Sequence, residues 1–175
     1  MPATRLASAL LEEIPQIIIF VLSFTLVANI WWFHHKIVAQ LAEIDVVMIT
    51  LNFVMLGLVA LIPFPTSLVG SARSESAAAV PFVAVFLGIS VTCLLMVLWA
   101  QRVGAWHRRP KSELYRWLVI GWSGYIVGLV LTTLVALWLP IVALVMAALL
   151  GVMTGVALGV FGPPAYREWE ERPGL

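Results

Sequence analysis

The chain has 175 residues and a net charge of +1, and 62% of its residues are apolar against 11% charged. Its mean hydropathy of +1.05 lies far above that of a soluble globular domain. The near-neutral charge argues against a nucleic-acid partner, and the single cysteine, Cys93, excludes an intrachain disulfide. We expect an integral membrane protein that forms one domain over residues 1–175.

Five uncharged apolar runs divide the chain. Each is long enough to cross a hydrocarbon core of about 30 Å as a helix that rises about 1.5 Å per residue. None shows the alternation of apolar and polar residues that is typical of a membrane barrel strand. The sequence therefore predicts an all-α membrane bundle with five spans, at residues 14–33, 46–62, 80–100, 117–138 and 141–161.

The first span ends in a tryptophan pair, and two histidines, His34 and His35, follow it. We expect residues 34–45 to form a short connection outside the membrane, with Asp45 capping the next helix. Consecutive helical residues point about 100° apart, so one imidazole can face the bundle while the other faces water. By themselves, paired histidines at a membrane interface are more typical of amphipathic anchors than of a functional site.

Proline and glycine mark the ends of the later elements. Pro63 and Pro65 are expected to end the second span, and residues 66–79 to form an extracellular loop. Ser112 is a candidate N-cap for the fourth span. Residues 138–140 (Trp-Leu-Pro) predict a tight turn that makes the last two spans an antiparallel hairpin.

The last two spans carry small residues at helical spacing, which lets helices approach closely in lipid. Such a face serves either as a subunit interface or, as we favour, for packing against neighbouring helices of the same chain. The residues concerned are Gly124, Gly128, Gly151, Gly155 and Gly159.

Basic residues are strongly biased to one side of the five spans. Eight of them (Lys36, Arg102, Arg108, Arg109, Lys111, Arg116, Arg167 and Arg172) fall on the side of the C-terminus, and only Arg5 and Arg73 fall on the other. Cytoplasmic segments carry an excess of Lys and Arg. The bias predicts a cytoplasmic C-terminus and an N-terminus outside.

No motif for catalysis, for a cofactor or for a metal stands out. The sequence lacks a Cys/His metal spacing, a phosphate loop and a nucleophile elbow. The first, third, fourth and fifth spans contain no Asp, Glu, Lys, Arg or His, so a proton relay at bilayer depth is not indicated. We therefore do not expect an enzyme, and we assign no catalytic residue, cofactor or metal.

Several short motifs resemble one family when they are taken in order. Paired histidines follow Trp31-Trp32, and Pro63-Phe64-Pro65-Thr66 comes one hairpin later, while Pro15-Gln16, Leu22-Ser23-Phe24 and Asn52 also fit. This pattern resembles the transmembrane protein 175 family, the bacterial and lysosomal potassium channels. The resemblance implies a homotetrameric, potassium-selective leak channel in the bacterial inner membrane. It also implies a hydrogen-bonded network of Trp31, His34, His35 and Asn52 that supports the pore.

One signature of that family does not occur in this sequence. The resemblance implies six spans, whose first helix carries an Arg followed by Phe-Ser-Asp and lines the ion pathway, and we expect that helix to be missing here. A late start codon, a truncation and a five-span variant are the three explanations. The alternative function is a non-conducting scaffold or accessory subunit. We expect the 175-residue chain alone not to conduct potassium, and the chain with an upstream signature helix to do so.

Overall fold

The computed structural model describes residues 3–72 and 76–160, with side chains described for residues 14, 16–69 and 76–154. Within these residues the chain is all-helical and contains no strand, which confirms the predicted fold class. Six helices follow one another: α1 (Ala3–Val38), α2 (Val46–Leu61), α3 (Pro63–Ala72), α4 (Ser76–Val103), α5 (Ser112–Ala136) and α6 (Pro140–Val160).

Four helical segments are long and apolar enough to cross a membrane, and α6 supplies a shorter one. The four are Gln16–Val38, Val46–Val69, Ser76–Val103 and Ser112–Ala136, and the fifth is Pro140–Thr154. The five apolar runs of the sequence are therefore five helical rods, because α2 and α3 together make the second. Only helices satisfy every backbone polar group within a bilayer unless a sheet closes on itself.

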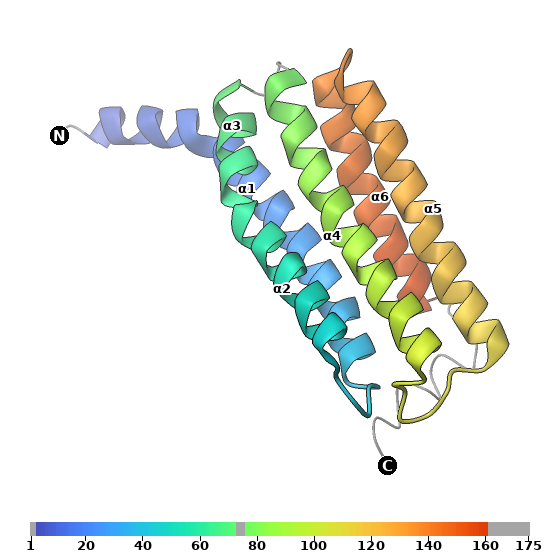
Figure 1. Cartoon of the computed structure of the whole chain (residues 1–175). Coiled ribbons are helices and arrows are strands. Elements are labelled where there is room, and N and C mark those ends of the chain that lie inside the picture. Colours follow the sequence, from blue (N-terminus) through green and yellow to red (C-terminus); the bar gives the residue numbers. More distant parts are fainter. Residues whose placement is uncertain (1–2, 73–75, 161–175) are drawn as a thin grey trace.

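Helix α4 lies at the centre of the bundle and packs against α2, α3, α5 and α6. Helix α1 contacts α3 and α6 and runs behind α2, and its first turns project sideways from the bundle (Figure 1). The α1–α2 connection and the α4–α5 connection lie at the same end of the molecule. Both connections were expected on one side of the membrane, and the fold places them together.

Helix α1 continues further than expected. It ends at Val38, so His34 and His35 stand on its last turns and not in a connection of residues 34–45. Capping bonds from Gln40 N to Ile37 O (3.1 Å) and from Leu41 N to Val38 O (3.0 Å) close the helix. No proline or glycine follows the histidines to stop the helix earlier, which explains the difference.

The expected turn at Pro63–Thr66 is a break within one rod. Helix α2 ends at Leu61, and Pro63 is the first residue of α3, which continues to Ala72. A proline is tolerated in the first turn of a helix because the N–H it lacks needs no partner there. The hydroxyl of Thr66 donates to Ile62 O at 2.7 Å and bridges the break. Most of the loop expected at residues 66–79 is therefore helical.

Of the three remaining predictions about helix ends, two are confirmed. Asp45 caps α2 as predicted, and its carboxylate accepts from Met48 N at 2.8 Å. The tight turn between α5 and α6 is also confirmed, since α5 ends at Ala136 and α6 begins at Pro140. The predicted N-cap at Ser112 was wrong: Ser112 is the first residue of α5, and the flanking Lys111 makes no side-chain capping bond.

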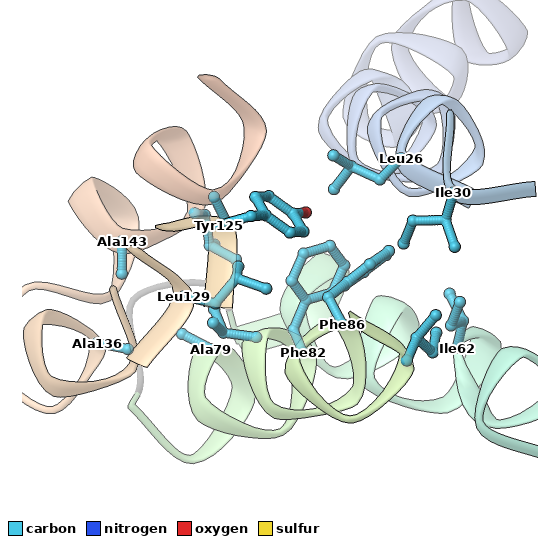
Figure 2. Close-up of a cluster of buried hydrophobic side chains, with 14 of the residues drawn as sticks. Leu26, Ile30, Ile62, Ala79, Phe82, Phe86, Tyr125, Leu129, Ala136 and Ala143 are labelled. Carbon is cyan, nitrogen blue, oxygen red and sulfur yellow. The ribbon is translucent and has the colours of Figure 1, made fainter. Parts of the chain in front are cut away.

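The main core lies where α4 meets its neighbours. Phe82 and Phe86 of α4 are fully buried, with ring centroids 5.1 Å apart. Figure 2 shows side chains of the same core that come from each of the other rods. They are Leu26 and Ile30 from α1, Ile62 from the α2–α3 break, Tyr125 and Leu129 from α5, and Ala143 from α6. The buried Cys93 also belongs to this core and packs with its sulfur 3.7 Å from that of Met55.

Candidate functional site between α1 and α2

The two histidines of α1 face different environments. His34 is partly buried and His35 is exposed, as their spacing on a helix requires. The side chain of Asn52, on α2, interacts with the imidazole of His34. Neither Nε2 of His34 nor Oδ1 of Asn52, both buried, completes a hydrogen bond within the described residues. Two adjacent helices thus bring two unpaired polar atoms into the same buried region.

The exposed residues of the motif pair with each other. Trp31 stacks on His35, with ring centroids 5.3 Å apart and ring planes inclined by 9°. The ammonium of Lys36 lies 4.5 Å from the centre of the Trp32 ring, in a cation–π contact. Trp31, His34, His35 and Asn52 therefore form two pairs, one facing outward and one between the helices.

Further from the histidine pair, toward the α3 end of the bundle, a groove opens between α1 and the α2–α3 rod. Its cavity of about 330 Å³ is mostly apolar, and its lining includes four polar side chains. Ser23 of α1 and Thr66 of α3 are both buried, but the Ser23 hydroxyl donates to Ile19 O of its own helix and the Thr66 hydroxyl donates to Ile62 O at the α2–α3 break. Pro63 and Thr66 of the predicted motif turn, together with Ser23 of the Leu22-Ser23-Phe24 match, therefore line one groove; Gln16 and Ser67 complete its polar lining.

The connections beside the histidine pair are braced against each other. Asp45 receives the indole N–H of Trp99, at the end of α4, at 2.8 Å. Ala42 N donates to Ala105 O at 2.8 Å, and His107 N donates to Gln40 O at 2.9 Å, which makes an isolated antiparallel β-bridge between Leu41 and Trp106. The hydrogen bonds from Met48 N and Trp99 hold the pKa of Asp45 below its usual range.

The sequence did not predict one side-chain hydrogen bond between helices. The amide of Asn29 in α1 donates to Gly151 O in α6 at 2.8 Å. A cavity of about 20 Å³ lies beside this bond, and Trp122, Tyr125 and Thr154 contribute to its lining. The indole Nε1 of Trp122 is buried without a partner within the described residues. A lone amide inside an apolar run was the signal that could have pointed to Asn29.

Two of the five glycines pack within the chain. A methyl group on Gly128 would meet Leu150 of α6 at 2.5 Å, and one on Gly151 would overlap Leu26 of α1. Gly124 faces open space instead. Gly155 and Gly159 lie outside the residues whose side-chain surroundings are described. At Gly128 and Gly151 close packing inside one chain accounts for the glycine.

No group of three His, Cys, Asp or Glu side chains that could hold a metal ion gathers among the described residues. What the site offers is therefore a buried polar pair, a mostly apolar groove and braced connections, all built from α1, the α2–α3 rod and the end of α4.

Comparison with known proteins points to the same part of the chain. Residues 1–63, which include α1 and α2, match the family model of the endosomal/lysosomal potassium channel TMEM175. A curated potassium channel of Streptomyces collinus is 28% identical over 109 residues, which are 61% of this chain and 50% of that protein. The chain thus spans about half the length of this relative. No solved structure matches the chain. The predicted resemblance is confirmed: residues 1–63 of this membrane protein are similar to the TMEM175 potassium channel family.

Proposed function

We propose that the chain is a subunit of a passive, potassium-selective channel of the bacterial inner membrane. The observation that carries this proposal is the family match over residues 1–63, the segment that also holds the His34–Asn52 pair. The curated relative described as a potassium channel supports the same ion. Five apolar rods supply the membrane-spanning frame that passive conduction requires.

The ion path is expected between copies of the chain. The interior of the bundle is filled by side chains such as Phe82, Phe86 and Met96, which are at most 2% exposed. Two cavities among the described residues, of about 330 and 440 Å³, lie at its margins beside α1 and are lined mainly by apolar groups. A third, of about 340 Å³, lies between the α1–α2 connection and the end of α4. The buried core formed by the described residues of one chain therefore offers no continuous polar route. A homotetramer with the path on its axis fits this arrangement.

In such an assembly the His34–Asn52 pair would support the pore and would not contact the ion. Both side chains are partly buried between α1 and α2, and each leaves one polar atom without a hydrogen bond in the described residues. Leaving a buried polar group unpaired costs about 1–3 kcal/mol. A polar group from water or from another copy that completes these bonds would stabilise the assembled state over the single chain.

The direct test is ion flux from liposomes loaded with potassium, under an imposed gradient. We compare the purified 175-residue protein with the same chain carrying an upstream helix with the Arg and Phe-Ser-Asp signature. Flux of potassium over sodium from either form supports the channel. If neither form conducts while both are folded and inserted, the function is wrong and a non-conducting scaffold takes its place.

A variant tests the supporting role separately. Asn52→Leu removes the amide beside His34 and is expected to lower the stability of the protein by about 1–3 kcal/mol and to reduce flux. The ratio of potassium to sodium flux should stay unchanged, because the amide does not contact the ion. Trp31→Leu is the control, since this exposed ring contacts His35 and not the buried pair. A changed ion ratio in Asn52→Leu would assign the pair to the ion path itself.

A further inference from the structure

The α4–α5 connection concentrates positive charge at one end of the bundle. Residues 102–116 contain five arginines and lysines, one histidine and a single acid, Glu113. All of the basic side chains and the histidine are exposed: Arg102, His107, Arg108, Arg109, Lys111 and Arg116. We call this set the basic rim. The connection that carries it joins two membrane-spanning helices, so the rim lies where lipid headgroups begin.

Buried anchors hold the backbone of the basic rim in place. Trp106 is 5% exposed, and Pro110, four residues later, is also buried. The indole of Trp106 donates to Gln101 at 3.1 Å, and the backbone on either side bonds to the α1–α2 connection. Gly104, with φ of 73°, lets the chain reverse directly after α4. The charges between and beside these anchors therefore project from a fixed frame, which lowers the entropy lost when they bind a partner.

The arginines of the basic rim have no ion-pair partner among the described residues. Within the described residues, Arg102, Arg108 and Arg109 form no ion pair with a carboxylate, and neither does Arg116. The two acids of the neighbouring α1–α2 connection, Glu43 and Asp45, form no ion pair with these arginines within the described residues either. Both oxygens of Asp45 accept hydrogen bonds, and Glu43 and Asp45 line a cavity of about 340 Å³ to which none of the four arginines contributes.

We propose that the basic rim binds the phosphate groups of anionic phospholipids in the cytoplasmic leaflet. The rim lies at headgroup depth, carries guanidinium groups with no ion pair among the described residues, and is flanked by Trp99 and Trp117, residues of the kind that settle at the membrane interface. Guanidinium groups bind phosphate through paired, charge-assisted hydrogen bonds. The inference does not depend on ion conduction, because a scaffold with the same rim would bind the same lipids.

The test measures lipid binding to the purified full chain in neutral detergent. Phosphatidylglycerol and phosphatidylcholine of equal chain length are titrated, and the bound lipids are counted by native mass spectrometry. We expect the wild type to prefer phosphatidylglycerol and to lose that preference as the salt concentration rises. Each surface cation contributes about fivefold in affinity for an anionic membrane. Arg108→Gln with Arg109→Gln should therefore weaken phosphatidylglycerol binding about 25-fold and leave phosphatidylcholine binding unchanged.

Two variants control for charge and for position. Arg108→Lys with Arg109→Lys keeps both charges and should retain most of the preference for phosphatidylglycerol. Lys36→Gln removes one charge at the same end of the molecule, from a side chain already placed over Trp32, and should have a smaller effect than Arg108→Gln alone. A midpoint of thermal unfolding equal to that of the wild type shows that each variant keeps the fold.

Three results would overturn the proposal. The first is equal binding of the two lipids by the wild type. The second is a full preference for phosphatidylglycerol in the folded double glutamine variant. The third is displacement of the lipid by millimolar inorganic phosphate, which would identify a site for the free anion and not for a membrane lipid.

Discussion

Asp45 shows how one carboxylate joins two helices at the membrane surface. One of its oxygens caps α2 through Met48 N, and the other receives the indole N–H of Trp99 from α4. Both bonds favour the ionised form, which is why its pKa lies below the ordinary value of 3.8. The residue was recognised from its position before an apolar run, but its partner on α4 depends on the tertiary fold.

Asp45 gives a prediction about pH. Because its pKa is lower in the folded state, the carboxylate stabilises the fold fully above the unfolded pKa. This contribution begins to fall when the pH drops below about 4, near the pKa of the unfolded state. It is lost once the pH is below the pKa of the folded state. We expect Asp45→Ala to lower the midpoint of thermal unfolding at pH 7 and to flatten its decline in acid. Asp45→Asn has a single carbonyl oxygen, so it can keep the cap but turns an NH2 group toward the indole N–H of Trp99, and it should unfold between Asp45→Ala and the wild type. Equal unfolding midpoints for Asp45→Ala and the wild type at pH 7 would contradict this role.

Asn29 gives a second prediction at this scale. Its amide is bonded to Gly151 O on another helix, and bonds of this kind between membrane helices stabilise by about 0.5–1.5 kcal/mol. Asn29→Ala should lose that amount in unfolding by denaturant. Thr25→Ala is the matched control on α1, because the exposed Thr25 hydroxyl bonds only to Val21 O of its own helix. If the two variants lose the same stability, the bond to α6 contributes nothing.

Among the helices, close packing is most evident where α5 meets α6. Gly128 lies against Leu150, whereas a methyl group on Gly124, one turn earlier on α5, would meet no neighbouring side chain within 4 Å. We expect Gly128→Val to destabilise the protein by about 1–3 kcal/mol through overpacking. Gly124→Val is the control for helix propensity and should cost far less in the single chain. Denaturation of both variants in the same detergent decides the matter. Comparable losses would place Gly124 at a contact too.

The helices were the most predictable part of the molecule. Five apolar runs identified five rods, because a bilayer demands both length and apolar character. Their ends were less certain. The Pro63 break was taken for a turn because proline stops a helix from within but is accepted in its first turn. The end of α1 was expected at Phe33 and lies at Val38, because amphipathic residues such as His34 continue a helix beyond its apolar run.

The candidate site was predictable only in part, and for a physical reason. A short motif gives the positions of His34 and Asn52, but the interaction between their side chains depends on how α1 and α2 cross. The stacking of Trp31 on His35 follows from their spacing of four residues on one helix, yet it was not foreseen. The bond from Asn29 to α6 joins residues 122 positions apart, which no local pattern encodes.

At the scale of the whole molecule, α1 is bordered by two open cavities. A cavity of about 330 Å³ separates part of it from the α2–α3 rod, and another of about 440 Å³ lies between it and α6. Large side chains of α1 such as Ile18, Phe20 and Phe24 are more than 60% exposed. In a bilayer, lipid chains or a second copy cover this surface. It is the part of the bundle through which an assembly of the proposed kind would form.

The orientation of the whole bundle is the last prediction. The two braced connections share one end, and the basic rim belongs to that end, so the bias of basic residues predicts that it faces the cytoplasm. Single cysteines at Ser71, near the end of α3, and at the exposed Ser112 report opposite ends of the bundle. A membrane-impermeant thiol reagent added to intact cells should label Ser71→Cys and spare Ser112→Cys until the cells are opened. The native Cys93 is 1% exposed, so the parent chain should remain unlabelled and serve as the control. Labelling of Ser112→Cys alone from outside would reverse the orientation and place the basic rim in the outer leaflet.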